Sequence, residues 1–215
     1  SASLNMARIA STRLTVMVAV LCIAFLISQF YRASIGVLTP TLMKDFVLSA
    51  NLLGILGGVY FLVFAVAQVP GGILLDRYGP RRVNSLLFSL VALGATIFAF
   101  AQTPTQLIAG RSIIGLGCAT CLMGTLVIFS RWLPAERFPF MVAIASGVGG
   151  SGALVATMPL AWAEDWLGWR GAILSMAAVT SLIAYLIWLL VRDYPPGDNP
   201  IPVRPETLRQ AVGGI

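Results

Sequence analysis

Residues 70–82 read PGGILLDRYGPRR, and they place one acid and three arginines within residues 76–82 of a chain that is otherwise almost free of charge. Uncharged runs flank this cluster on both sides, at residues 52–75 and 83–101. A bilayer core of roughly 30 Å is crossed by about 20 apolar residues in a helix. The cluster is therefore expected to be the polar turn between two membrane-spanning helices.

The composition of the whole chain favours a membrane protein. Of its 215 residues, 58% are hydrophobic and 10% are charged, which is too little polar surface to coat a soluble globule of this size. Long apolar runs without strict alternation predict helices, since a barrel strand needs only about 10 residues. We therefore expect an all-α membrane protein with six transmembrane helices. The six expected spans are residues 14–39, 52–75, 83–101, 106–130, 138–163 and 171–191.

The positive charges are unevenly distributed between the two sides of these spans. Cytoplasmic loops carry the excess of Lys and Arg, and a count over short loops sets the orientation. One side has Lys44 and Arg170. The other side has ten arginines: Arg8, Arg13, Arg77, Arg81, Arg82, Arg131, Arg137, Arg192, Arg204 and Arg209. We expect a multi-pass protein of the cell membrane, such as a bacterial inner membrane, with both termini cytoplasmic and no nucleic-acid partner.

A second copy of the charged turn indicates an internal repeat. Residues 76–81 (DRYGPR) and residues 165–170 (DWLGWR) both read DxxGxR, and each follows the second span of a three-span unit. An odd number of spans separates them, so the two turns face opposite sides of the membrane. This is the pattern of an inverted-topology repeat, with units at residues 14–101 and 105–191.

Two motifs resemble those of a known transporter family. Residues 72–82 (GILLDRYGPRR) resemble the loop signature GxxxDRxGxRR of the major facilitator superfamily, in its usual place between the second and third helices. Residues 111–117 (RSIIGLG) resemble the pattern RxxxGxG of its fourth helix. The resemblance covers nearly the whole chain and matches the amino-terminal six-helix half of a twelve-helix transporter. It implies a secondary transporter that works by alternating access, without a cofactor.

The resemblance also gives an interpretation of the two ends of the chain. Residues 1–13 are expected to form a cytoplasmic N-terminus. Residues 192–215 begin Pro-rich and polar, and residues 206–212 look like the first turns of the linker helix between the two halves. Because the substrate sites of such transporters lie between the halves, the predicted partners are a small solute, the lipid bilayer and either a second six-helix half or another copy of the chain.

The loop signature implies a gate. In the superfamily the acid that matches Asp76 holds a helix of the opposite half and steadies the outward-facing state, so Asp76 and Arg77 are expected to bias a two-state equilibrium. The Asp76 carboxylate can also accept hydrogen bonds from a helix N-terminus. Gly79 permits the tight turn, and Gly72 is expected to let another helix approach closely. For Arg81 and Arg82, the alternative is that they have no gating role and only keep the loop on the cytoplasmic side. The expected gate and motif residues are Gly72, Asp76, Arg77, Gly79, Arg81, Arg82, Gly115 and Gly117.

Two arginines lie within the expected spans, which contain no Asp, Glu, Lys or His. A charge at membrane depth normally faces a cavity or a partner. At about 1.5 Å per residue, both arginines fall in the outer third of the membrane, so one cavity can hold both. Two guanidiniums suit a carboxylate or phosphate ligand. We expect an anionic substrate, with a site formed by Arg32, Arg111, Gln29, Ser28, Tyr31 and Gln68. The alternatives are that Arg32 reaches the outer headgroups and that Arg111 bonds carbonyls of the first span as a structural strut.

Enzymatic function is excluded by the residue types in the spans. The chain has no His and no paired acids within a span, so an intramembrane protease has no catalytic groups. No metal site is expected. The remaining alternative to a transporter is a non-transporting membrane assembly factor or receptor built on the same fold.

Overall fold

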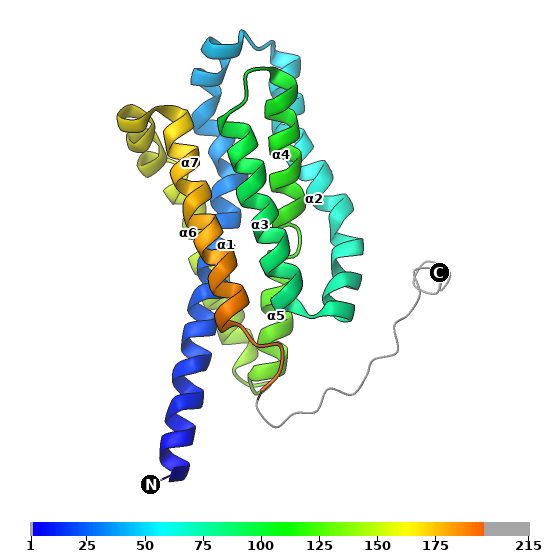
Figure 1. Cartoon of the computed structure of the whole chain (residues 1–215), viewed down its shortest axis with the longest axis vertical. Coiled ribbons are helices and arrows are strands. Elements are labelled where there is room, and N and C mark those ends of the chain that lie inside the picture. Colours follow the sequence, from blue (N-terminus) through cyan, green and yellow to red (C-terminus); the bar gives the residue numbers. More distant parts are fainter. Residues whose placement is uncertain (1, 196–215) are drawn as a thin grey trace, which may run out of the picture.

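The computed structural model describes the backbone of residues 2–195 and the side chains of residues 12–195. The described chain is entirely helical, without strands, and α4 and α5 together form one span, which gives six helices long and apolar enough to cross a membrane (Figure 1). The six-helix prediction is confirmed, whereas the predicted linker helix at residues 206–212 lies outside the described residues. The helices are α1 (Ala2–Phe46), α2 (Ala50–Tyr78), α3 (Pro80–Ala99), α4 (Pro104–Cys118), α5 (Cys121–Trp132), α6 (Phe138–Val155) and α7 (Met158–Leu190).

Local sequence signals fix where the helices begin. Ser49 precedes α2, and its hydroxyl accepts a hydrogen bond from the Leu52 N–H at 3.3 Å. Thr103 and Gln106 form a reciprocal capping box at the start of α4. Such caps satisfy backbone donors that have no partner within the helix. The start of the fourth span is therefore determined by the local capping residues Thr103 and Gln106.

Three spans differ from the expectation: the first was expected to end at residue 39, whereas α1 continues to Phe46, and the fourth and fifth are interrupted. The fifth span, expected over residues 138–163, ends at Val155, because Thr157 leaves the helical conformation (φ −103°, ψ −107°) and Pro159 has no N–H to continue the ladder. Residues 158–167 form a separate helical segment before the sixth span. The fourth span was expected to be continuous, and it is broken at residues 119–120 between α4 and α5.

The inverted repeat is visible in the backbone of the two DxxGxR turns. Gly79 (φ 81°, ψ 152°) and Gly168 (φ 69°, ψ 163°) have nearly the same left-handed conformation, which favours glycine. The repeat that the sequence indicates therefore recurs as repeated geometry, and the predicted fold class is confirmed.

The arginines of the two turns make reciprocal contacts between α3 and α7, which lie side by side and antiparallel (Figure 1). Arg81, in the first turn of α3, donates from Nε to the Trp188 carbonyl near the end of α7, at 2.7 Å. Arg170, just after the kink in α7, donates from Nη1 to the carbonyls of Ala99 and Ala101 at the end of α3, at 2.6 and 2.8 Å. Each arginine therefore satisfies carbonyls that a helix end leaves unpaired.

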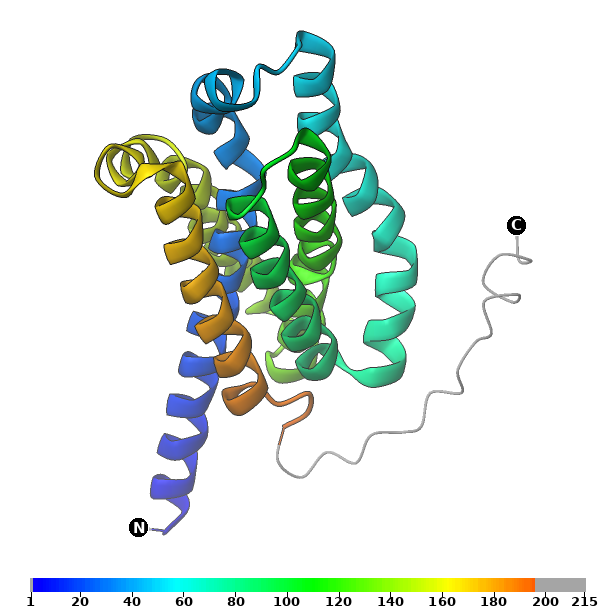
Figure 2. The same ribbon diagram turned by 45° about the horizontal axis from the view of Figure 1, so that its top comes forward.

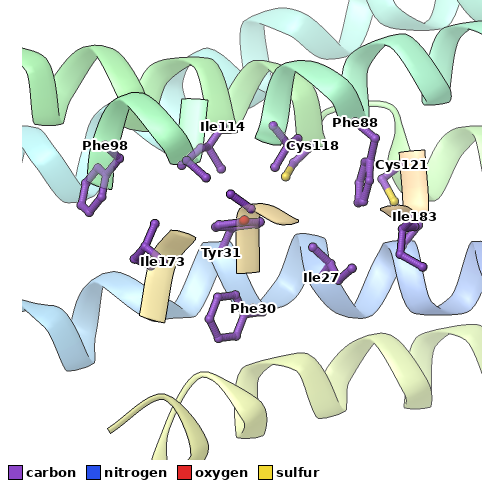
Figure 3. Packing of buried hydrophobic residues seen from close by; sticks show 14 of the residues in the cluster. Ile27, Phe30, Tyr31, Phe88, Phe98, Ile114, Cys118, Cys121, Ile173 and Ile183 are labelled. Atoms are coloured by element: carbon purple, nitrogen blue, oxygen red, sulfur yellow. The ribbon is translucent and has the colours of Figure 1, made fainter. Parts of the chain in front are cut away.

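The core lies between α1, α3, α4 and α7. Figure 3 shows Tyr31 of α1 among Ile114 and Cys118 of α4 and Ile173 of α7, all of them buried. The helices α3 and α4 approach closely at Gly94, where an added Cβ would lie 2.9 Å from the Gly110 carbonyl oxygen. The spans α2 and α6 are the least enclosed, and each presents large apolar side chains on its outer face.

Candidate functional site

Arg111 lies in the interior of the bundle and is only 2% exposed. Its Nη1 donates to the carbonyl of Tyr31, and its Nη2 donates to the carbonyl of Arg32 at 3.2 Å. Its Nε has no hydrogen-bond partner. Within residues 12–195 no Asp or Glu pairs with this guanidinium, so a buried positive charge has no counter-ion.

The residues around Arg111 explain how the charge is tolerated. Gly115 lies one turn further along α4 on the same face, and a Cβ there would come 2.7 Å from the Tyr60 carbonyl oxygen of α2. The absence of a side chain lets α2 approach, which brings the Tyr60 ring centre to 4.7 Å from the Arg111 guanidinium carbon. An aromatic face at this distance attracts a cation.

Arg32 lies next to Tyr31 on α1 but is exposed. Its guanidinium carbon is 5.1 Å from the centre of the Phe61 ring of α2. The two arginines are connected through the backbone, since Arg111 bonds the Arg32 carbonyl. The structure therefore brings the two predicted cations to one region of the bundle, with one buried and one accessible.

The other predicted substrate residues differ in accessibility. Ser28 is buried, and Gln29 and Gln68 are half-buried. Tyr31 is buried, and its hydroxyl forms a 3.1 Å hydrogen bond with Thr180 Oγ1 of α7, a pairing in the core rather than at an open surface. In the described conformation Tyr31 contributes its carbonyl to Arg111 and its ring to the packing (Figure 3).

The expected cap on a helix N-terminus is made by a different acid. Asp76 is exposed, and within the described residues its carboxylate accepts no hydrogen bond. Asp193, just after α7, accepts from the Arg81 N–H at 2.7 Å in the first turn of α3. Gly79 has a positive φ that favours glycine, and a Cβ there would lie 2.6 Å from the Asp193 Oδ2, so an added side chain would displace this carboxylate. Asp193 therefore binds the N-terminus of α3, and the expected contact of Asp76 with a helix of the opposite half stays a prediction.

The close contact expected at Gly72 is made one residue earlier. Nothing lies within 4 Å of a Cβ added at Gly72, whereas one at Gly71 would come 2.5 Å from the Thr120 methyl carbon. Thr120 occupies the break between α4 and α5, and its hydroxyl bonds Asn84 Oδ1 of α3 at 3.0 Å. Gly117 is also a contact glycine, with a Cβ position 2.9 Å from the Val91 nitrogen of α3.

The remaining motif residues lie at the end of the bundle that carries the loop after α2. Arg77 is exposed, with its guanidinium carbon 5.4 Å from the ring centre of Tyr78, and Arg82 is exposed as well. Arg81 is half-buried against Trp188. Two of the three loop arginines, Arg77 and Arg82, are therefore accessible at this end of the bundle.

Six apolar helices arranged as an inverted repeat of three-helix units are typical of the membrane proteins that include secondary transporters. The sequence profile of the Major Facilitator Superfamily matches residues 21–212, and the chain belongs to this family. The resemblance found in the two motifs is thereby confirmed.

The similar curated proteins are transporters rather than enzymes. A nitrate/nitrite transporter, NrtP, of Picosynechococcus sp. is 28% identical over 204 residues, covering 82% of this chain and 38% of the relative. A probable sulfoacetate transporter, SauU, of Cupriavidus necator is 23% identical, with 84% and 41% covered. A probable galactarate/D-glucarate transporter, GudP, of Escherichia coli is 26% identical, with 81% and 41% covered. The chain spans about two fifths of the length of these relatives.

A solved structure shares the fold. A bacterial homologue of the human lysosomal transporter Spinster, in an inward-facing and unoccupied conformation, superposes with a TM-score of 0.71 at 21% identity. The match covers 93% of this chain and 47% of that protein.

Proposed function

We propose that this chain is the amino-terminal half of a secondary transporter that moves a small anion across the membrane by alternating access. The observation that carries the proposal is the buried Arg111 guanidinium, which has an unpaired Nε and no acidic partner in the described chain. A substrate anion would supply the missing counter-charge through charge-assisted hydrogen bonds. The nitrate, sulfoacetate and galactarate/D-glucarate named for the relatives are all anions, which supports this substrate class.

The proposed site lies between this chain and a second unit. Arg32 is its accessible cation and Arg111 its buried one, with Ser28, Gln29 and Gln68 as polar neighbours. The outer faces of α2 and α6 carry exposed apolar residues that a second six-helix half would cover, and a second copy of this chain is the other candidate. The exposed Asp76 and Arg77 would meet that unit and act as the gate, on the cytoplasmic side.

The proposal is tested by uptake of labelled nitrate, sulfoacetate and D-glucarate into proteoliposomes that hold the chain assembled with a second six-helix half. We expect saturable uptake of at least one anion. Arg32→Ala should raise its KM about tenfold, because an accessible charge partner of the substrate is lost. Arg137→Ala is the matched control, since Arg137 is an exposed arginine at the start of α6, and it should leave KM unchanged.

The opposite outcome is equally clear. An assembled protein that takes up none of these anions, with or without Arg32, would favour the non-transporting assembly factor or receptor. Saturable uptake that Arg32→Ala leaves unchanged would remove Arg32 from the site.

A further inference from the structure

The two cations of the proposed site lie against consecutive aromatic residues of one helix. The Arg111 guanidinium carbon is 4.7 Å from the Tyr60 ring centre, and that of Arg32 is 5.1 Å from the Phe61 ring centre. Both distances are within the roughly 6 Å range of a cation–π contact. Consecutive side chains of a helix project about 100° apart, so α2 presents one ring toward α4 and the other toward α1.

The orientation of the rings is fixed by their neighbours. Gly115 lets the Tyr60 backbone pack against α4, so the ring has little freedom to move away from Arg111. Phe64, one turn along α2, stacks on Tyr60 with 5.9 Å between ring centres and 19° between planes. Tyr60 and Phe61 meet edge to face at 5.3 Å. The three rings therefore form one contact group on α2.

We propose that Tyr60 and Phe61 are positioning residues that hold the two guanidiniums for the substrate, an inference that rests on the proposed function. A carboxylate in their place would neutralise each arginine, whereas an aromatic face attracts the cation and leaves its charge available to an anion. Because α2 continues to Asp76, a movement of the gate loop would carry both rings with it. The anion site and the gate would then be coupled by one helix.

The test compares variants that remove a ring with variants that keep it, using nitrate uptake by the assembled protein. Tyr60→Leu should raise KM about tenfold with kcat within about twofold, and Tyr60→Phe should restore KM, since the ring rather than the hydroxyl faces the guanidinium. Phe61→Leu should raise KM about threefold, and Phe61→Tyr should restore it. Phe88→Leu is the control: Phe88 is a buried aromatic of α3 without a cation contact, and its loss should leave KM unchanged.

The outcomes separate this inference from the proposed function. Wild-type uptake of nitrate with unchanged KM in both leucine variants would overturn the positioning role and leave the function standing. If the wild type takes up another of the tested anions but not nitrate, the KM comparison is made with that anion. Absence of uptake of every tested anion by the wild type would count against the function, and the ring contact would then be read from arginine modification by phenylglyoxal, measured by mass spectrometry. Phe61→Leu should speed modification of Arg32 about threefold, and an unchanged rate would overturn the contact itself.

A second, independent observation concerns residues 158–167, the helical segment before Gly168. This segment turns away from the direction of the spans (Figure 2). Met158, Trp162 and Trp166 are four residues apart and share one face, on which Trp162 is 62% and Trp166 89% exposed. On the opposite face Leu160 is 3% exposed, and the Thr41 hydroxyl of α1 bonds Glu164. Within the described residues, the face with Leu160 and Glu164 therefore packs on the protein, whereas the face with Trp162 and Trp166 is largely exposed.

We propose that this segment lies in the outer headgroup layer of the bilayer, with Trp162 and Trp166 in contact with lipid. Large apolar residues are exposed on both sides of the break at residues 156–157, at Leu154 in α6 and at Met158 in this segment. Tryptophan is enriched at the boundary between headgroups and acyl chains, where its ring is apolar and its N–H reaches water. Through Thr41, the segment would fix the outer end of α1 relative to the membrane surface.

The test uses variants that keep one Trp, with the other four changed to Phe, in bilayers of phosphatidylcholine brominated at acyl carbons 6 and 7. Fluorescence of the Trp166 variant should fall by about half relative to unbrominated lipid, and aqueous iodide should quench it weakly. The variant that keeps the buried Trp169 is the control and should respond to neither quencher. Strong iodide quenching without a bromine effect would show a water-exposed helix, and quenching by neither would show a face covered by protein. Either result would overturn the proposal.

Discussion

Arg111→Met is expected to reduce anion uptake about 100-fold while the protein stays folded. Methionine removes the charge that the substrate would bind, and loss of a buried charge partner costs about 2–5 kcal/mol of binding free energy. The two hydrogen bonds to the first helix stabilise the fold by about 1.5–3 kcal/mol each. Burying the Arg111 charge without a counter-ion costs folding free energy similar to the sum of the two. The two terms nearly cancel, so the melting temperature should stay within about 4 °C of the wild type.

This result distinguishes the two roles open to Arg111. If Arg111 is only a structural strut to the carbonyls of Tyr31 and Arg32, its loss would lower uptake through instability. Anion uptake and the melting temperature would then fall together. Stability can be read with a thiol-reactive dye, because Cys22, Cys118 and Cys121 are free and buried until the chain unfolds. Arg111→Lys keeps the charge with a single point of contact and should reduce uptake about tenfold. Uptake by the methionine variant within twofold of the wild type would remove Arg111 from the site.

The fold was largely predictable because a bilayer imposes a length on each helix. Apolar runs gave six spans, and the two DxxGxR turns gave the inverted repeat, which recurs as matching backbone at Gly79 and Gly168. The end of the fifth span was not predictable from charge, since residues 156–163 continue the uncharged run of the span. Thr157 and Pro159 end the helix there, and the conformation depends on how Leu160 packs on the bundle.

The site was predictable only where charge marks it. Arg32 and Arg111 stand out because charge is rare within a span. Tyr60 gives no such signal, since an aromatic residue in an apolar run has the same pattern whether it faces lipid or a cation. Asp193 lies 112 residues from its partner Arg81, and nothing in either local sequence connects them. Its role depends on the antiparallel packing of α3 and α7, which the motif alone does not specify.

Gly79→Ala is expected to destabilise the protein about twice as much as Gly168→Ala. Both glycines have positive φ, and placing a side chain on such a backbone costs about 1–3 kcal/mol at either position. No atom of the described residues lies within 4 Å of a Cβ at Gly168. The loss of stability in Gly168→Ala is therefore only the cost of the positive φ. At Gly79 the Cβ would also displace the Asp193 carboxylate from the Arg81 N–H, and loss of such a cap costs a further ~1–2 kcal/mol.

The matched glycine pair therefore isolates the contribution of Asp193. With about 2–4 °C per kcal/mol for a chain of this length, the dye-monitored melting temperature should fall by roughly 6–12 °C for Gly79→Ala and by half of that for Gly168→Ala. Asp193→Ala alone should cost about 1–2 kcal/mol, but little more when added to Gly79→Ala, because the cap is already lost. Equal losses for the two glycine variants, or full additivity with Asp193→Ala, would show that the carboxylate does not bind the α3 N-terminus. Non-additivity would instead establish that Asp193, just after α7, stabilises the turn between α2 and α3.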